Sequence, residues 1–304
     1  MNTKTTYETI LATQQRVPAW REEDLIGGDK RLDFTKRILP EGLAGVDGLA
    51  FLSEAERRTL NQIRGHEYLT MFGLVEEFIL PFVMDHARPL LRESDARTRA
   101  LLQFAGEEAK HIDLFKRFRS AFAEGFSTPC DVIGPSEAVA AEVLKHHPLA
   151  VALLILHIEW FTQRHFLESV KDNGDLDPLF RSLLKHHWLD EAQHGKLDLL
   201  MVEALAAACP LEERIEAFNE YLELGMFLDR GLAAQMDMNL AAFTRATGRR
   251  LTDEQTSAYQ DAQRRALRWT YIGSGITHPM FLDAVEGLDC SLRRKAEELG
   301  PMFC

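Results

Sequence analysis

The feature that most constrains this chain is a repeated motif in which an acid and a Glu are followed, after two further residues, by His. It occurs as Glu107, Glu108 and His111, and again as Asp190, Glu191 and His194. A further Glu lies 32 residues before the Glu of each motif, namely Glu76 in LVEEF and Glu159 in HIEWF. This equal spacing predicts two helical hairpins, each with one Glu on its first arm and E-x-x-H on its second, as a four-helix bundle with a two-metal centre requires.

The apolar pattern agrees with an all-α fold. Apolar residues recur three and four positions apart over long stretches, and the alternation typical of strands is almost absent. Capping boxes at Ser53 and Thr252 mark helix starts. Prolines mark others, and YIGSGITHP is expected to separate the last helices. Helices are predicted over about 53–88, 94–123, 148–172 and 178–207, with a fifth beginning at Pro210. One domain is expected over 1–304, with a metal-binding bundle at about 53–207 and a C-terminal elaboration at about 210–304.

Helix geometry explains why the motif suits a metal. Residues three apart lie one turn above each other, so each E-x-x-H pair can hold one ion from one face. Apolar residues such as Phe72 and Ile155 surround these positions, and unpaired buried carboxylates would cost several kcal/mol each. Carboxylate and imidazole ligands without thiolate favour iron or manganese over structural zinc. The predicted ligands are Glu76, Glu108, His111, Glu159, Glu191 and His194.

Together these residues resemble the ferritin-like di-iron carboxylate proteins, over Leu69 to Asp198. EEAKH and LDEAQH are similar to motifs of the acyl-carrier-protein desaturases and bacterial multicomponent monooxygenases. The resemblance implies that Glu107 and Asp190 each accept a hydrogen bond from the metal-bound His of the other motif.

One further residue narrows the resemblance. His187 lies one turn before Glu191, whereas Phe104 holds the equivalent place on the second helix. An additional His there is similar to the para-aminobenzoate N-oxygenase family, di-iron enzymes that bind iron with three His and oxidise arylamines. This likeness implies that His187 is a seventh ligand, but a hydrogen-bonded or solvated His is the alternative. No motif covers the C-terminal third of the chain.

Other positions carry alternatives as well. Glu77 competes with Glu76 as the first ligand, although the 32-residue spacing favours Glu76. Thr162 lies one turn after Glu159, where relatives often place a hydroxyl near the oxygen site, and it is the candidate catalytic residue. An ordinary helix Thr bonded to its own backbone is the other interpretation. Three more residues are expected at the helix surface or in support of the ligands: His157, His165 and Asp198.

These residues predict an O₂-dependent oxygenase that holds two iron ions, with manganese as an alternative at one position, and acts on a small organic substrate. N-oxygenation of an amine is the first choice, and hydroxylation or desaturation of carbon is the second. A ferroxidase or peroxide-handling protein is the third, but roughly one hundred additional C-terminal residues favour a substrate lid. No flavin, nicotinamide or iron–sulfur motif is visible, so an external electron donor is expected.

Charge and cysteine content restrict the partners. The net charge of −12 argues against nucleic acid and anionic membranes. The longest apolar run, 149–158, is too short to cross a bilayer. The four cysteines are scattered without a C-x-x-C pair or a secretory leader, which favours a reducing, cytoplasmic location. The oligomeric state is open, with a homodimer as one option.

Overall fold

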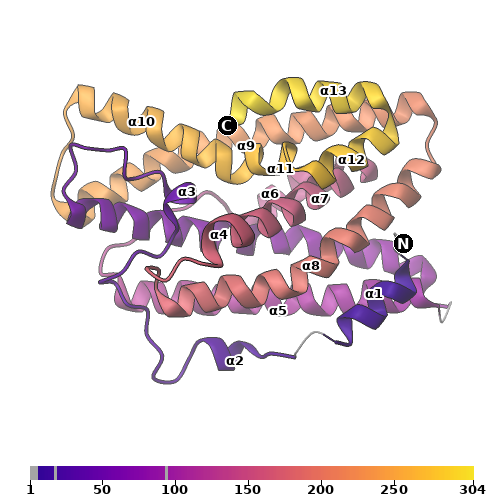
Figure 1. The fold of residues 1–304 in the computed structure, drawn as a ribbon, viewed down its shortest axis with the longest axis horizontal. Helices are drawn as coiled ribbons and strands as arrows, with labels where there is room; N and C mark the ends of the chain where they lie inside the picture. The colour runs from indigo at the N-terminus through magenta and orange to yellow at the C-terminus, as the bar shows by residue number, and fades with distance from the viewer. Residues whose placement is uncertain (1–5, 17–18, 93–94) are drawn as a thin grey trace.

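Four long helices form the bundle at the centre of the molecule (Figure 1). The structure is a computed structural model that describes residues 6–16, 19–92 and 95–304. The bundle helices are α4 (Glu54–Ala87), α5 (Ala96–Gly125), α7 (Pro148–His165) and α8 (Pro178–Ala207). Helix α4 packs along α5 and α7 packs along α8, so the two predicted hairpins exist, and α5 and α8 bring them together.

Local signals set the starts of these helices. Ser53 and Glu56 form both bonds of the predicted capping box at α4. Asp177 caps α8, where Pro178 occupies the first turn. Helix α5 begins after the capping side chain of Asp95, while the predicted start, Ser94, lies outside the described residues. Helix α7 ends earlier than predicted, and a π-helical turn over Phe166–Val170 continues it.

The C-terminal helices cover one side of the bundle (Figure 1). Helix α9 (Leu211–Thr247) packs against both α4 and α7, and α10 (Asp253–Arg268) packs on α9. Helix α12 (Pro279–Leu288) contacts α7 and α8, and it also packs on α13 (Cys290–Leu299). These elements extend the core of the bundle, because buried apolar residues form one cluster from Ile10 to Ala296.

YIGSGITHP separates the last helices only near its end, where Thr277 and His278 precede α12. Most of this segment is helical, as a π-helical turn over Trp269–Gly273 followed by α11 (Ser274–Ile276). Its glycines permit close packing rather than a loop: a Cβ on Gly275 would lie 2.4 Å from Nε2 of His157, on α7. Sequence patterns do not distinguish a glycine that ends a helix from one that lets another element approach it.

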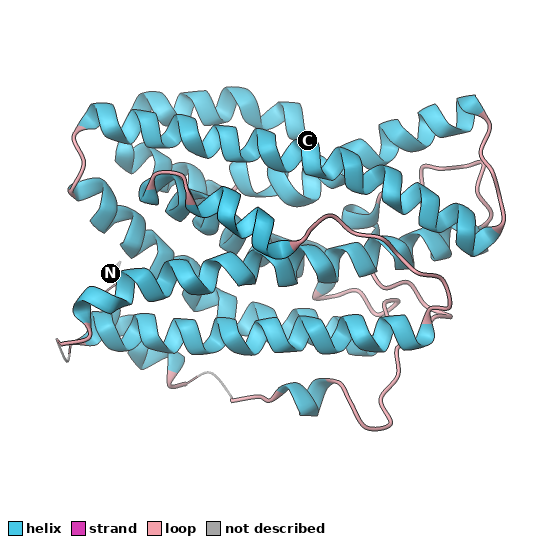
Figure 2. Ribbon diagram, turned by 180° about the vertical axis from the view of Figure 1, so that it is seen from behind, coloured by secondary structure: helices cyan, strands magenta, loops and turns pink. Residues whose placement is uncertain are grey.

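Shorter helices complete the fold. Helix α1 (Tyr7–Gln14) lies on α5 and α8, α2 (Glu22–Leu25) contacts the same pair, α3 (Glu41–Ala44) lies near α10, and α6 (Ser136–Leu144) contacts α4 and α7. Figure 2 shows that the described residues contain helices and loops without a strand, which confirms the all-α prediction. One isolated backbone bridge joins Arg37 to Leu176. None of the described helices combines the length and apolar character needed to cross a membrane.

Candidate metal centre

All seven predicted ligands are buried inside the bundle. Helix α4 supplies Glu76 and α7 supplies Glu159, while α5 and α8 supply the residues of the two motifs together with His187. Each of the seven is at most 2% exposed. Four carboxylates and three imidazoles therefore occupy an interior that is otherwise lined by rings such as Phe72, Phe104 and Phe115.

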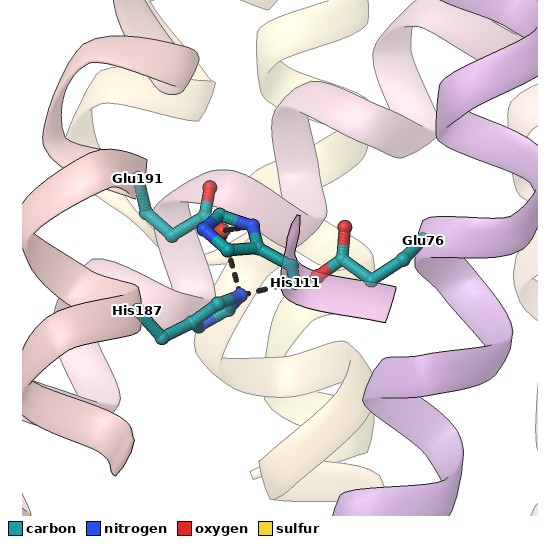
Figure 3. A group of neighbouring side chains, drawn as sticks. All are labelled: Glu76, His111, His187 and Glu191. Carbon is teal, nitrogen blue, oxygen red and sulfur yellow. Dashed lines mark hydrogen bonds and ion pairs between the residues drawn. The ribbon is translucent and has the colours of Figure 1, made fainter. Parts of the chain in front are cut away.

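The first group of donor atoms joins Glu76, His111, His187 and Glu191 (Figure 3). Their ligand atoms all lie within 4.8 Å of one another. Nε2 of His187 is 2.6 Å from Oε1 of Glu191 and 3.1 Å from Oε1 of Glu76. Nδ1 of His111 is 3.1 Å from the same Glu191 oxygen. Three helices, α4, α5 and α8, thus direct carboxylate and imidazole atoms to one point.

The second group joins Glu108, His111, Glu191 and His194. Nδ1 of His194 lies 2.8 Å from Oε1 of Glu108 and 2.8 Å from Oε2 of Glu191. Both carboxylates thus compete for one nitrogen, and the other oxygen of Glu108, Oε2, has no hydrogen-bond partner. Nδ1 of His111 makes no hydrogen bond of good geometry, although Oε1 of Glu191 lies 3.1 Å away. Buried polar atoms are normally satisfied, so these free donor atoms fit a pair of bound cations.

Glu159 lies beside these groups without belonging to either. Its carboxyl is buried, and its Oε2 has no hydrogen-bond partner. Burial, followed by the nearby charge of Glu191, raises its pKa well above the usual value. Its free oxygen makes Glu159 available as a terminal ligand close to the second group.

The pKa values show how the residues balance charge without a metal. Burial and the charge of Glu108 raise the pKa of Glu76 well above its usual range. Burial alone would raise the pKa of Glu191. The nearby imidazoles of His187 and His194 have a larger, opposite effect, so the pKa of Glu191 lies well below its usual value. Burial lowers the pKa of His187, whereas nearby carboxylates, chiefly Glu191, outweigh burial at His111 and His194 and raise their pKa values. The buried carboxylates thus attract positive charge, which divalent cations could supply.

The outer nitrogens of the motif histidines bond across the bundle. Nε2 of His111 lies 3.2 Å from Oδ2 of Asp190, and Nε2 of His194 lies 2.9 Å from Oε2 of Glu107. Each acid therefore reaches the His of the other motif, in the arrangement that the family resemblance implied. Their Nε2 atoms thus face these acids, while their Nδ1 atoms face the carboxylates of the cluster.

Three residues near this centre had no signal in the sequence. Nζ of Lys110 donates to Asp190 over 2.6 Å, and Trp20 stacks on the ring of His111 with 6.2 Å between ring centroids. Nε2 of Gln14 lies 3.5 Å from Oε2 of Glu107. Trp20 and Gln14 come from the N-terminal segment, where no motif indicated a role. Their positions depend on how that segment packs over α5 and α8.

Two alternatives from the sequence are now placed. Glu77 is half-buried and lies 3.4 Å from Lys116, away from the cluster, whereas Glu76 faces it. The hydroxyl of Thr162 donates to the carbonyl of Ile158 over 2.9 Å, the usual bond of a helix Thr. No other partner of this hydroxyl occurs among the described residues.

The three remaining polar residues are buried rather than at the surface. His157 bonds to Tyr221, and His165 bonds to Tyr68 and Ser274. Asp198 is fully buried one turn beyond His194, and neither of its oxygens has a hydrogen-bond partner. The apolar positions around them did not reveal that the C-terminal helices would cover this side of α7.

A third group, His147, Cys209 and Glu213, has similar spacing but different chemistry. Nδ1 of His147 accepts the backbone N–H of Leu149, so its Nε2 carries the proton and donates to Glu213 over 3.0 Å. That nitrogen has no free lone pair to offer a metal. These residues therefore act as a cap and hydrogen bond at the start of α7.

A four-helix bundle that carries paired E-x-x-H motifs and further buried carboxylates defines the class of ferritin-like two-metal carboxylate proteins. The family model described as "P-aminobenzoate N-oxygenase AurF" matches residues 17–270. The chain belongs to this family, and it is a di-iron oxidoreductase, as the sequence predicted. No curated protein matches it significantly.

Solved structures with a similar fold are variants of the R2-like ligand-binding oxidase. One with an aerobically reconstituted Mn/Fe cofactor is 13% identical and covers 90% of this chain and 97% of that chain, with a TM-score of 0.50. Another with an aerobically reconstituted Fe/Fe cofactor is 13% identical and covers 90% and 94%, with a TM-score of 0.49. At this identity the first likeness supports the ferritin-like fold alone.

Proposed function

We propose that the protein is an O₂-dependent di-iron N-oxygenase that acts on a small organic amine. The observation that carries this proposal is the place of His187, whose Nε2 reaches both Glu191 and Glu76 inside the cluster. A third imidazole distinguishes this centre from desaturase-like and hydroxylase-like sites, which have one His for each iron. It supports N-oxygenation, the activity in the name of the family.

The geometry suggests how seven ligands divide between two ions. Glu76, His111 and His187 would hold one ion, since their donor atoms share the first group. Glu108, Glu159 and His194 would hold the other, and Glu191, which belongs to both groups, would contribute to both. Four carboxylates balance two divalent ions, which leaves the imidazoles neutral and the buried centre without net charge. Manganese could replace iron at one position, because both ions accept these ligands.

Bound iron would supply the redox chemistry by which O₂ is activated and the amine is oxidised. The residues of this chain hold and orient the centre. Asp190 and Glu107 fix the ring planes of His111 and His194 through their hydrogen bonds. The surrounding phenylalanines exclude water. An external donor would supply electrons, since the sequence has no motif for a bound redox cofactor.

The proposal is tested with purified protein reconstituted anaerobically with Fe(II), mixed with a reductant, O₂ and an arylamine. We expect about two iron ions per chain and hydroxylamine, nitroso or nitro products, measured by metal analysis and mass spectrometry. Glu76→Ala should lose iron and product, while the adjacent Glu77→Ala is the matched control and should retain both. Two bound irons with oxidation of carbon instead of nitrogen would refute the N-oxygenase assignment.

A further inference from the structure

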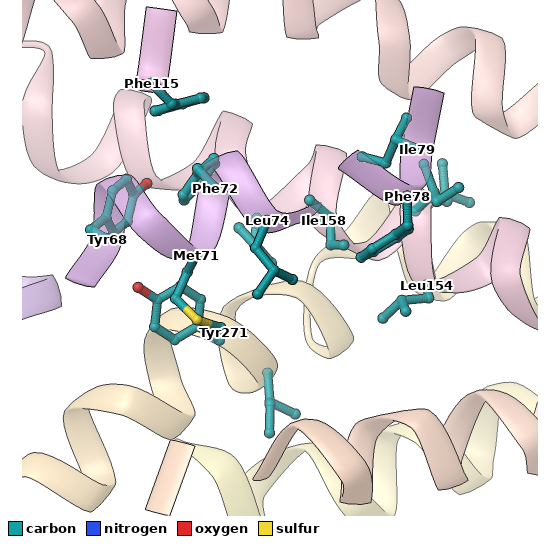
Figure 4. Packing of buried hydrophobic residues seen from close by; sticks show 14 of the residues in the cluster. Tyr68, Met71, Phe72, Leu74, Phe78, Ile79, Phe115, Leu154, Ile158 and Tyr271 are labelled. Atoms are coloured by element: carbon teal, nitrogen blue, oxygen red, sulfur yellow. The ribbon is translucent and has the colours of Figure 1, made fainter. Parts of the chain in front are cut away.

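An apolar cavity of about 210 Å³ lies between α4, α6, α7 and α9. Figure 4 shows Leu74, Phe78, Leu154 and Ile158, which belong to its wall. Helix α9 closes it on the outer side with Leu228 and neighbouring residues. Every residue of the wall is aliphatic, aromatic, Met or Gly, so no side chain inside can pair with a charge or a strong hydrogen-bonding group.

The cavity lies against the two helices that carry Glu76 and Glu159. Val75 and Ile158 belong to its wall, and they immediately precede Glu76 and Glu159 in the sequence. Successive helix residues point about 100° apart, so the cavity and the carboxylates lie on neighbouring faces of the same two helices. Helix α9 packs on both α4 and α7 and closes the gap between them.

Charged residues are found only in an outer hollow. Leu74, Ile133 and Gly134 separate the cavity from a more open space of about 380 Å³, which is lined by Arg119, Glu77 and Glu137 among others. Glu77 lies 3.4 Å from Nζ of Lys116, so the hollow carries charges of both signs outside the cavity. A carboxylate on a ligand inside the cavity would thus meet apolar side chains alone.

We propose that this cavity binds the substrate, and that the substrate is a neutral arylamine without a carboxylate. A cavity of roughly 150 Å³ with apolar walls is large enough for benzene, so this one accommodates an aromatic ring with a small substituent. An ionised carboxylate would lose its hydration without gaining a partner. The inference rests on the proposed function only for what happens to the bound amine. Binding itself can be measured without turnover.

Binding is measured by calorimetry on the metal-free and Fe(II)-loaded protein under anaerobic conditions, with aniline and 4-aminobenzoate at pH 7 as probes. Aniline should bind at least about 100-fold more tightly than 4-aminobenzoate. Burying an unpaired carboxylate costs more free energy than the two factors of ten in affinity require. Aniline binding without oxidation would leave this inference standing and refute the proposed function. Absence of aniline binding, or tighter binding of 4-aminobenzoate, would overturn the inference.

Two glycines of α9 provide a matched pair of variants. Gly231 belongs to the cavity wall, and a Cβ there would lie 3.4 Å from Cδ1 of Ile133, whereas a Cβ on Gly225 would have nothing within 4 Å. Gly231→Leu should lower aniline affinity at least about tenfold, and Gly225→Leu should leave it unchanged. Leu228→Phe, in the same wall, gives a second cavity-filling variant if Gly231→Leu does not fold. Unchanged affinity in a folded cavity variant would overturn the proposal, as would binding of 4-aminobenzoate that is lost in Arg119→Gln.

Discussion

The two hydrogen bonds behind the motif histidines should differ in their contribution to metal affinity. Asp190 is 5% exposed, and its Oδ2 accepts from both His111 and Lys110. Its carboxylate is strongly favoured: burial opposes the charge, but His111 and Lys110 lower its pKa to about 2. Glu107 is 19% exposed and bonds to His194 near solvent. Water can therefore replace the Glu107 carboxylate but not that of Asp190.

The prediction follows from this difference in exposure. Loss of a carboxylate behind a metal-bound His typically lowers metal affinity about 10- to 100-fold, or roughly 1.4 to 2.8 kcal/mol. Asp190→Ala should lie at the upper end of this range, because the buried N–H of His111 and the ammonium of Lys110 both lose their acceptor. Glu107→Ala should lie at the lower end.

Anaerobic Fe(II) titration in competition with a chromophoric chelator measures both affinities. Half-buried Glu77 provides the control, since Glu77→Ala removes a carboxylate of the same helical bundle without touching the cluster. Asp190→Asn should restore part of the affinity, because its amide oxygen still accepts from His111. Equal losses in the two alanine variants, or a larger loss in Glu107→Ala, would show that solvent exposure does not control these contributions.

Three further predictions concern binding, packing and pH. Glu108→Ala should reduce metal content from about two ions per chain to one or fewer in metal analysis, since it removes a carboxylate of the second group; full occupancy would contradict its role. Gly275→Ala should destabilise the protein by about 2 kcal/mol or more in denaturant unfolding, because the new Cβ would overlap His157. Gly287→Ala, in α12 with nothing within 4 Å, should be neutral or slightly stabilising; equal effects would refute the packing argument. Burial lowers the pKa of His165 to about 3. As the pH falls, the imidazole therefore takes up a proton in the unfolded chain before it does so in the folded protein. The free energy of unfolding should fall by roughly 3 kcal/mol between pH 6.5 and pH 4. In His165→Gln that part of the pH dependence should disappear from unfolding free energies, and an unchanged profile would mean that the imidazole is charged in the fold.

Local sequence patterns predicted the bundle well, because its helix caps and ligand spacing depend on residues that are close together in the sequence. Ser53 and Thr252 cap the helices that they were expected to cap, since a capping side chain bonds to backbone groups within a few residues. The E-x-x-H spacing likewise depends on helix geometry alone. In contrast, Trp20 reaches His111 through tertiary packing, and no local pattern encodes such a contact. The helical segment around Gly275 was missed for the same reason, because its glycine serves a contact with a distant helix.

The internal repeat explains the symmetry of the centre, and one position explains its asymmetry. His187 and Phe104 are equivalent in the two hairpins, four residues before the Glu of each motif. The ring of Phe104 packs on His194 with 4.2 Å between centroids, whereas His187 instead brings a nitrogen to Glu76 and Glu191. One half of the centre thus gains a neutral donor, while the other half is enclosed by an apolar ring. A neutral imidazole adds no charge, so His187 would hold an ion without changing the charge balance. Val75 and Ile158, which line the apolar cavity, precede Glu76 and Glu159, so both halves lie on helices that form its wall. The two ions, when bound, would therefore be held by unequal sets of side chains beside the same cavity.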